Sequence, residues 1–212
     1  MNMRDLTRFS TYVVPIDLTF NQYLLRTTSY ALLVHTGNMT IGKSLLANLQ
    51  DQLGKQKLDA IFISHFESDE CGALSLFVAA YPEVTVYCSE VTSRELKGFG
   101  IEANTVVVTD EARIENESVH LSFITYPSEV HLWNGLLLVE EKRKILFSSD
   151  LVFAFGDSRN EKIEKSWSEC IDSNAPYQIP NPSSLDKLKI TLSQKDVAYV
   201  APGHGPEVEI IQ

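Results

Sequence analysis

The sequence LDAIFISHFESDECG occupies residues 58–72. Its first half, Leu58 to Ser64, is mostly apolar and predicts a strand that is buried on both faces. Four side chains that can bind metals follow at once: His65, Glu67, Asp69 and Glu70. Ligands tend to bind where the strands of an α/β sheet end, and acidic groups beside an apolar strand are costly to bury unless positive charge compensates them. We therefore expect a site for a pair of divalent cations at the end of this strand.

Segments of strand and helix alternate on both sides of this stretch. Strands are predicted at residues 12–17, 30–35, 84–88, 105–108, 119–125, 135–139, 144–148 and 197–200. Helices are predicted at residues 41–53, 72–81, 89–97 and 185–192. The polar residues 157–184 fit either a mobile excursion over one end of the sheet or a helix followed by a loop. A single domain with a mixed sheet and outer helices is the simplest arrangement.

Three more candidate site residues lie downstream. His131 stands beside Trp133, Asp150 ends the predicted strand, and His204 lies in the turn Pro-Gly-His-Gly-Pro. The glycines of that turn let the backbone approach a site closely. Because His65, Asp150 and His204 all follow strands, we expect them to gather at one rim of the fold. His35 and His120, by contrast, occupy strand positions outside any motif, and we interpret both as structural.

Composition narrows the possible functions. The chain has 212 residues, enough for one sizeable core, and its formal net charge of −10 disfavours binding to nucleic acid. We find no apolar run long enough to span a membrane and no signal peptide. The three cysteines, Cys71, Cys88 and Cys170, show no CxxC spacing and fit a reducing, cytoplasmic location.

The motif His65-x-Glu67-x-Asp69 is followed by Cys71-Gly72 and then, in order, by His131, Asp150 and His204. This pattern resembles the metallo-β-lactamase fold. More narrowly, it is similar to the diiron domain of flavodiiron proteins and of the stand-alone oxygen-binding diiron proteins. Hydrolases of this fold usually carry His-x-His-x-Asp-His, whereas the flavodiiron branch has glutamate at the second position. The resemblance implies an α+β fold, an αββα sandwich of two mixed sheets flanked by helices. We expect a single domain over residues 1–212. The flavodoxin domain that brings FMN in flavodiiron proteins is not expected in it, which is a departure from the family.

The resemblance also implies a set of metal ligands. One iron would be held by His65, Glu67 and His131, the other by Asp69 and His204, and Asp150 would bridge them. Glu70 departs from the family, which usually has histidine at this position. That leaves three roles open for Glu70: ligand, hydrogen-bond partner of a bound water, or a side chain that points away. A second departure is Leu132-Trp133-Asn134, which replaces the family's usual Trp-Pro-Asp after this histidine.

The chemistry of the donor set points in the same direction. Several carboxylates combined with imidazoles suit iron or manganese, although ligand type alone leaves zinc open. The leading hypothesis is a diiron protein that binds O2 or NO. It would act either as a reductase supplied by an external donor, such as rubredoxin or a flavoprotein, or as an oxygen sensor working with a signalling protein. The head-to-tail homodimer of flavodiiron proteins is left open.

Two other classes of function remain at this stage. A binuclear hydrolase acting on an ester, thioester or phosphodiester would use a metal-bound hydroxide as its nucleophile. Glu67 disfavours this alternative because zinc hydrolases of the fold rely on three imidazoles. The second of these classes is a metal-free scaffold that has lost catalysis, and the near-complete ligand set disfavours it.

Overall fold

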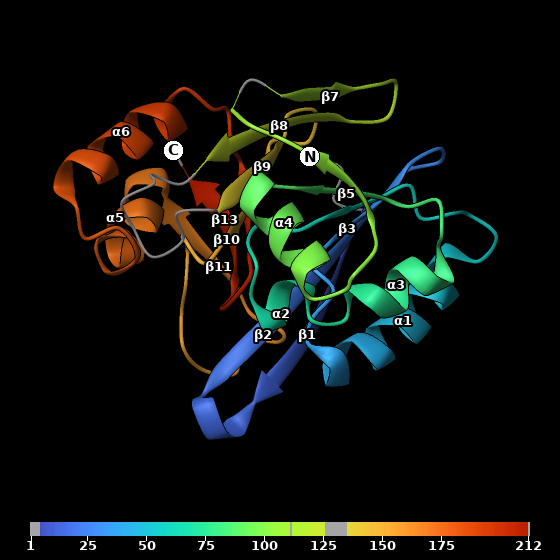
Figure 1. The fold of residues 1–212 in the computed structure, drawn as a ribbon. Coiled ribbons are helices and arrows are strands. Elements are labelled where there is room, and N and C mark those ends of the chain that lie inside the picture. Colours follow the sequence, from blue (N-terminus) through green and yellow to red (C-terminus); the bar gives the residue numbers. More distant parts are fainter. Residues whose placement is uncertain (1–4, 111, 126–134, 212) are drawn as a thin grey trace.

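Two β-sheets packed face to face form the centre of the molecule, and helices cover their outer faces (Figure 1). The computed structural model describes residues 5–110, 112–125 and 135–211. Both sheets mix parallel and antiparallel pairs. The predicted αββα sandwich is therefore confirmed.

The first sheet has six strands, in spatial order β1 to β6. They are β1 (Leu6–Val13), β2 (Leu18–Arg26), β3 (Ala31–Val34), β4 (Ala60–Phe62), β5 (Thr85–Cys88) and β6 (Asn104–Val107). β1, β2 and β3 pair antiparallel, whereas β3 to β6 pair parallel. The crossovers between the parallel strands carry α1 (Met39–Leu53), α2 (Ser68–Cys71), α3 (Leu74–Ala80) and α4 (Glu90–Gly98).

The second sheet has seven strands, in the order β11-β13-β12-β10-β9-β8-β7. They are β7 (Arg113–Glu115), β8 (His120–Thr125), β9 (Leu136–Glu140), β10 (Ile145–Ser149), β11 (Lys162–Ser166), β12 (Tyr199–Pro202) and β13 (Glu207–Ile211). β10 runs parallel to β12, and β11 runs parallel to β13. Helices α5 (Trp167–Gln178) and α6 (Pro182–Ser193) connect β11 to β12.

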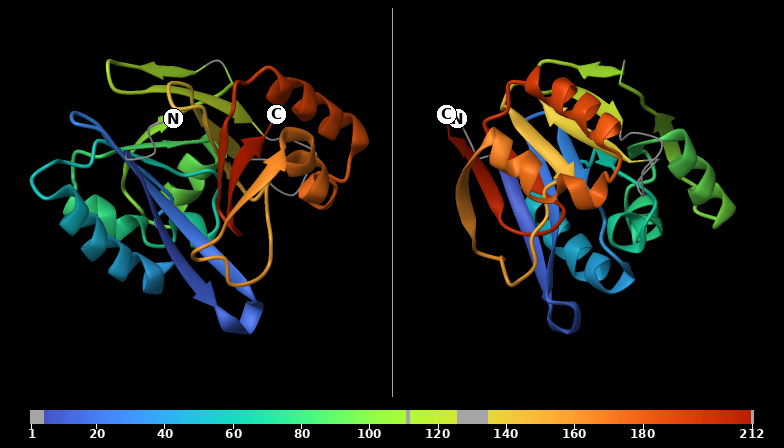
Figure 2. Two further views of the ribbon diagram at one scale, coloured as in Figure 1. Left: turned by 180° about the vertical axis from the view of Figure 1, so that it is seen from behind. Right: turned by 90° about the vertical axis from the view of Figure 1, so that its left-hand side faces the viewer.

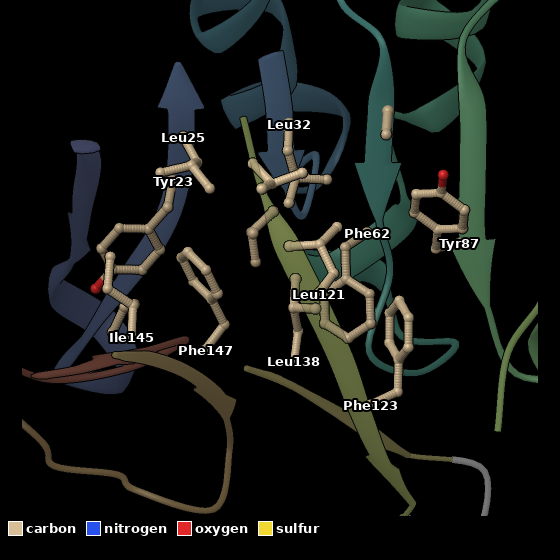
Figure 3. Packing of buried hydrophobic residues seen from close by; sticks show 14 of the residues in the cluster. Tyr23, Leu25, Leu32, Phe62, Tyr87, Leu121, Phe123, Leu138, Ile145 and Phe147 are labelled. Atoms are coloured by element: carbon tan, nitrogen blue, oxygen red, sulfur yellow. The ribbon is translucent and has the colours of Figure 1, made fainter. Parts of the chain in front are cut away.

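The main core lies between the sheets. Figure 3 shows side chains of the first sheet, such as Tyr23, Leu32 and Phe62, facing Phe123 and Phe147 of the second sheet. All five are at least nine-tenths buried, and burying a side chain of this size contributes about 1.5–3 kcal/mol. This shared core holds the two sheets in a fixed relation, and so fixes the loops at their rim.

Each sheet has a second apolar layer under its helices. Leu45, Leu49 and Leu53 of α1 pack on Ile61 of β4, whose neighbour Phe62 faces the other sheet. The predicted burial of this strand on both faces is therefore confirmed. A separate cluster joins α6 to β9 and β10. Figure 2 shows the blue and teal helices of the first sheet on the opposite side of the molecule from the orange and red helices of the second.

Some elements differ from the predicted ones in their bounds or content. The strand predicted at residues 12–17 ends at Val13, and Val14–Ile16 forms a 3-10 turn with Pro15 near its start. The helix predicted at residues 72–81 is α3, which spans Leu74–Ala80, and the short helix α2 precedes it at Ser68–Cys71. The polar residues 157–184 contain the strand β11 as well as α5 and the start of α6. Among the described helices, none combines the length and apolar character needed to cross a bilayer.

Candidate metal centre

The candidate site residues gather where strands of both sheets end. His65 follows β4 of the first sheet, and Asp69 and Glu70 lie in the short helix α2 just beyond it. Asp150 follows β10 of the second sheet, and His204 lies in the turn between β12 and β13. The predicted gathering of these residues at one rim is therefore seen in the structure.

The two imidazoles form two half-sites that share Asp150. His65 Nε2 lies 3.8 Å from Glu67 Oε1, 3.5 Å from Glu70 Oε2 and 3.8 Å from Asp150 Oδ2. His204 Nε2 lies 3.2 Å from Asp69 Oδ2 and 3.5 Å from Asp150 Oδ1. One oxygen of Asp150 therefore faces each imidazole. His131 and Trp133 lie outside the described residues.

Hydrogen bonds at the far side of each imidazole prepare Nε2 to act as a ligand. His204 Nδ1 lies 3.3 Å from the carbonyl oxygen of Thr19, which can only accept, so Nδ1 carries the proton. His65 Nδ1 lies 3.0 Å from Ser64 Oγ, which in turn contacts Ser149 Oγ at 2.8 Å. Both contacts fix the orientation of a ring, and the bond to Thr19 leaves a lone pair on His204 Nε2 for a metal.

Close backbone packing brings the two loops of the second sheet together. Ser149 has a φ of 47°, and the register between β10 and β12 shifts beside it. Its carbonyl oxygen accepts a 2.9 Å hydrogen bond from Gly203 N. Gly205 has a φ of 96°, and a Cβ there would lie 2.9 Å from Ala154 N. The expectation that glycines allow a close approach at this turn is therefore confirmed.

The carboxylates of the centre perturb one another. Burial raises the pKa of Glu70 well above its usual range, and the charges of Asp150 and Asp69 raise it further. Burial alone would also raise the pKa of Asp69, but the hydrogen bond and charge of His204 outweigh it and lower this pKa to about 2. Burial lowers the pKa of His204, and the nearby Asp69 and Asp150 more than offset this, so the net direction is upward.

Two buried atoms of the centre, His65 Nε2 and Glu70 Oε2, have no hydrogen-bond partner within the described part of the chain. In the same part of the chain, Asp69, Glu70 and Asp150 form ion pairs with histidine and none with lysine or arginine. Unpartnered buried polar atoms are costly, and a cation between them would satisfy both. The donors fall into two groups able to hold a metal, His65/Glu67/Glu70 and Asp69/Glu70/His204. Hard oxygen donors mixed with imidazole fit ions such as iron or manganese.

Several residues that support the centre could not be recognised from the sequence. Thr19 and Ser149 belong to strands far from the motif, and only tertiary contacts bring them to His204 and His65. Phe20 and Phe153 pack edge-on against the His204 ring, with centroids 4.9 and 5.4 Å away. Cys71 is a buried neighbour of the centre, where burial raises the pKa of its thiol to about 12.

The model of one protein family, described as ODP family beta lactamase, matches residues 18–205. The chain belongs to this family. The match covers both half-sites and all strands from β2 to β12. The resemblance of the motif to the diiron domain of flavodiiron proteins is thereby confirmed.

Relatives of this ODP-family chain include proteins named anaerobic nitric oxide reductase flavorubredoxin. It is 29% identical over 149 residues to the anaerobic nitric oxide reductase flavorubredoxin of Vibrio vulnificus, covering 68% of this chain and 29% of that protein. It is 28% identical over 142 residues to the flavorubredoxin of Pectobacterium carotovorum, covering 65% of this chain and 27% of that protein. The chain therefore spans less than a third of the length of these relatives.

Solved structures share the fold of the ODP-family chain. The flavodiiron protein from Giardia intestinalis superposes with a TM-score of 0.80 at 17% identity, over 98% of this chain and 55% of that one. Rubredoxin oxygen:oxidoreductase from Desulfovibrio gigas gives a TM-score of 0.79 at 18% identity, over 99% of this chain and 57% of that one.

Proposed function

We propose that this ODP-family chain holds two iron ions and reduces O2 or NO with electrons from a donor outside residues 1–212. The proposed ligands are His65, Glu67, Asp69, His131, Asp150 and His204. The observation that carries the proposal is the placement of Asp150, whose two oxygens face the Nε2 atoms of His65 and His204. A carboxylate whose two oxygens face different imidazole half-sites can be shared by a pair of ions.

When bound, the iron pair supplies the electrons that O2 or NO accepts. The residues of this chain determine how readily that happens. Glu67, Asp69 and Asp150 bring negative charge to the ions, which stabilises the ferric over the ferrous state and makes electron donation more favourable. Ser64 and Thr19 hold the imidazoles in the orientation that directs Nε2 inward. Phe20 and Phe153 cover the His204 ring and limit the access of water to this side.

The source of electrons and the gaseous ligand are part of the proposal. The flavorubredoxin relatives are named nitric oxide reductases, and the neighbour from Desulfovibrio gigas is named a rubredoxin:oxygen oxidoreductase. We infer that a rubredoxin or a separate flavoprotein supplies electrons to this chain. An oxygen sensor that passes its state to a signalling protein would use the same centre, and turnover distinguishes the two roles.

The test is anaerobic reconstitution with Fe(II), followed by addition of a reduced rubredoxin or flavin donor and then O2 or NO. We expect two irons per chain and consumption of gas over many turnovers. Two variants make the result specific. Glu67→Gln should lose much of its iron and its turnover, because it removes one proposed ligand. Glu140→Gln should keep its iron and its turnover. Glu140 lies in β9, is paired with Arg143 and stands opposite Ile145 at the start of β10, whereas Asp150 follows the end of β10.

Three outcomes would decide against the proposal. Iron that binds O2 without turnover would favour a sensor. Zinc retained at two per chain together with hydrolysis of model esters would favour the hydrolase. A wild-type protein that takes up no metal of any kind would favour the metal-free scaffold.

A further inference from the structure

We propose that Glu70 is a ligand shared by both metal ions, so that two carboxylates rather than one join the half-sites. This proposal rests on the metal centre proposed above and concerns a residue outside its six ligands. Glu70 is 2% exposed, and its Oε2 lies 3.5 Å from His65 Nε2 with no hydrogen-bond partner among the described residues.

Glu70 also belongs to both groups of donors that can hold a metal. In one group its carboxylate oxygen lies within 4.8 Å of the donor atoms of His65 and Glu67. In the other group it lies within 4.8 Å of the donor atoms of Asp69 and His204. A side chain pointing away from the centre would belong to neither group. A hydrogen-bond partner of one bound water would not need to reach both imidazole half-sites.

The backbone around Glu70 is held in place. Its carbonyl oxygen accepts hydrogen bonds from Thr36 N at 2.7 Å and from Thr36 Oγ1 at 3.1 Å, which tie α2 to the end of β3. Gly72 closes the same turn, and a Cβ there would lie 2.3 Å from the carbonyl oxygen of Ser68. A carboxylate on such a fixed turn is positioned before any ion arrives, as a ligand requires.

The charges of the centre balance only when Glu70 is counted. Glu67, Asp69, Glu70 and Asp150 carry four negative charges when ionised, and two divalent ions carry four positive charges. Without Glu70 the ferrous pair would keep one unbalanced positive charge. Glutamate also has two oxygens, so it can serve two ions at once, whereas an imidazole Nε2 serves one.

The experiment is a stepwise anaerobic titration of metal-free protein with Fe(II), repeated with Co(II) for its visible spectrum. Wild-type protein should bind two ions. Glu70→Gln should weaken both binding steps by about tenfold or more, because it removes a donor from each half-site. Glu70→His should restore one step and leave the other weak. Glu140→Gln, which removes another buried carboxylate, should change neither step by more than about twofold.

The stability of the metal-free protein gives a second readout. Replacing a buried carboxyl group whose Oε2 has no partner, beside the like charges of Asp69 and Asp150, should let metal-free Glu70→Gln melt at or above the wild-type temperature, and saturation with metal should reverse this order. If Glu70→Gln binds both ions as tightly as the wild type, or weakens one step alone, the shared role is wrong. A lower melting temperature of the metal-free variant would assign Glu70 a structural role and also overturn the proposal. Failure of wild-type protein to bind two ions would instead contradict the metal centre itself.

Discussion

Two residues with left-handed backbone stand beside the candidate centre, each at the end of a strand. His35 has a φ of 63° after β3, and Ser149 has a φ of 47° at the end of β10. Residues other than glycine adopt this conformation at a cost, and such strain clusters at functional sites. Ser149 turns the chain just before Asp150, and His35 turns it just before Thr36, whose backbone N donates to the carbonyl oxygen of Glu70. The backbone at this rim therefore adopts locally unfavourable conformations beside the site.

His35 gives a prediction about pH. It is 2% exposed and stacks on Phe62, and burial, followed by the charge of His65, lowers its pKa to about 3. The unfolded chain therefore binds this proton more readily between pH 6.5 and 3, and stability is lost as the pH falls through that window. The loss is about 1.4 kcal/mol per pH unit.

His35→Asn is the matched variant, because asparagine tolerates left-handed backbone and does not titrate. Urea unfolding of both metal-free proteins at several pH values measures the effect. Relative to the variant, the wild type should become less stable by about 1.4 kcal/mol for each pH unit below 6. Parallel curves for the two proteins would contradict this assignment.

At the scale of elements, the packing of α1 against the junction of α2 and α3 holds the metal-binding turn. A Cβ on Gly42 of α1 would lie 2.1 Å from Ala73 Cβ and 3.0 Å from the carbonyl oxygen of Thr36. Gly42→Ala should therefore destabilise the protein by about 1–3 kcal/mol through overpacking. Gly98→Ala in α4 has open space around its Cβ and should be neutral or stabilising by up to about 1 kcal/mol. Chemical unfolding of the two variants would contradict the packing argument if they behaved alike.

The elements also show where sequence patterns succeed. β4 and α1 were predictable because apolar residues recur at the strand and helix periods and face defined layers. β2 was not predicted, because Thr19, Asn21 and Gln22 are polar and yet buried. Asn21 Nδ2 donates to the carbonyl oxygens of Pro202 and Gly205, so the polar side chain serves the His204 turn. β7, β11 and β13 are short or polar strands near the sheet edge, where burial leaves little trace in the sequence.

Part of the candidate site was also predictable from local sequence patterns. His65, Glu67 and Asp69 are close in sequence, and Asp150 and His204 end strands, so a motif could place them together. Their role as ligands stays a prediction. The position of Glu70 depends on how α2 turns, and the support from Thr19 depends on contacts between the sheets. Neither is visible in a local pattern.

At the scale of the whole molecule, the candidate centre joins the two sheets. Its first four residues come from the loop after β4, whereas Asp150 and His204 come from the second sheet. A bound ion would therefore connect the halves of the sandwich at its rim, in addition to the apolar core between them. Because that core is extensive, we expect the metal-free protein to stay folded, with metal adding stability by mass action.

The size of this effect can be estimated and measured. An ion at a thousand times its dissociation constant adds about 4 kcal/mol, which raises the melting temperature of a protein of this length by roughly 8–16 °C. Calorimetry with Fe(II) and with a chelator under anaerobic conditions measures the difference. The double variant Asp150→Asn/His204→Ala keeps the donors of the first sheet but loses those of the second. Its melting temperature should rise by less than about half as much at the same metal excess, because the ion no longer connects the sheets. If the double variant were stabilised as strongly as the wild type, the metal would not join the two halves. If chelation left the wild-type melting temperature unchanged, no metal would contribute to the fold.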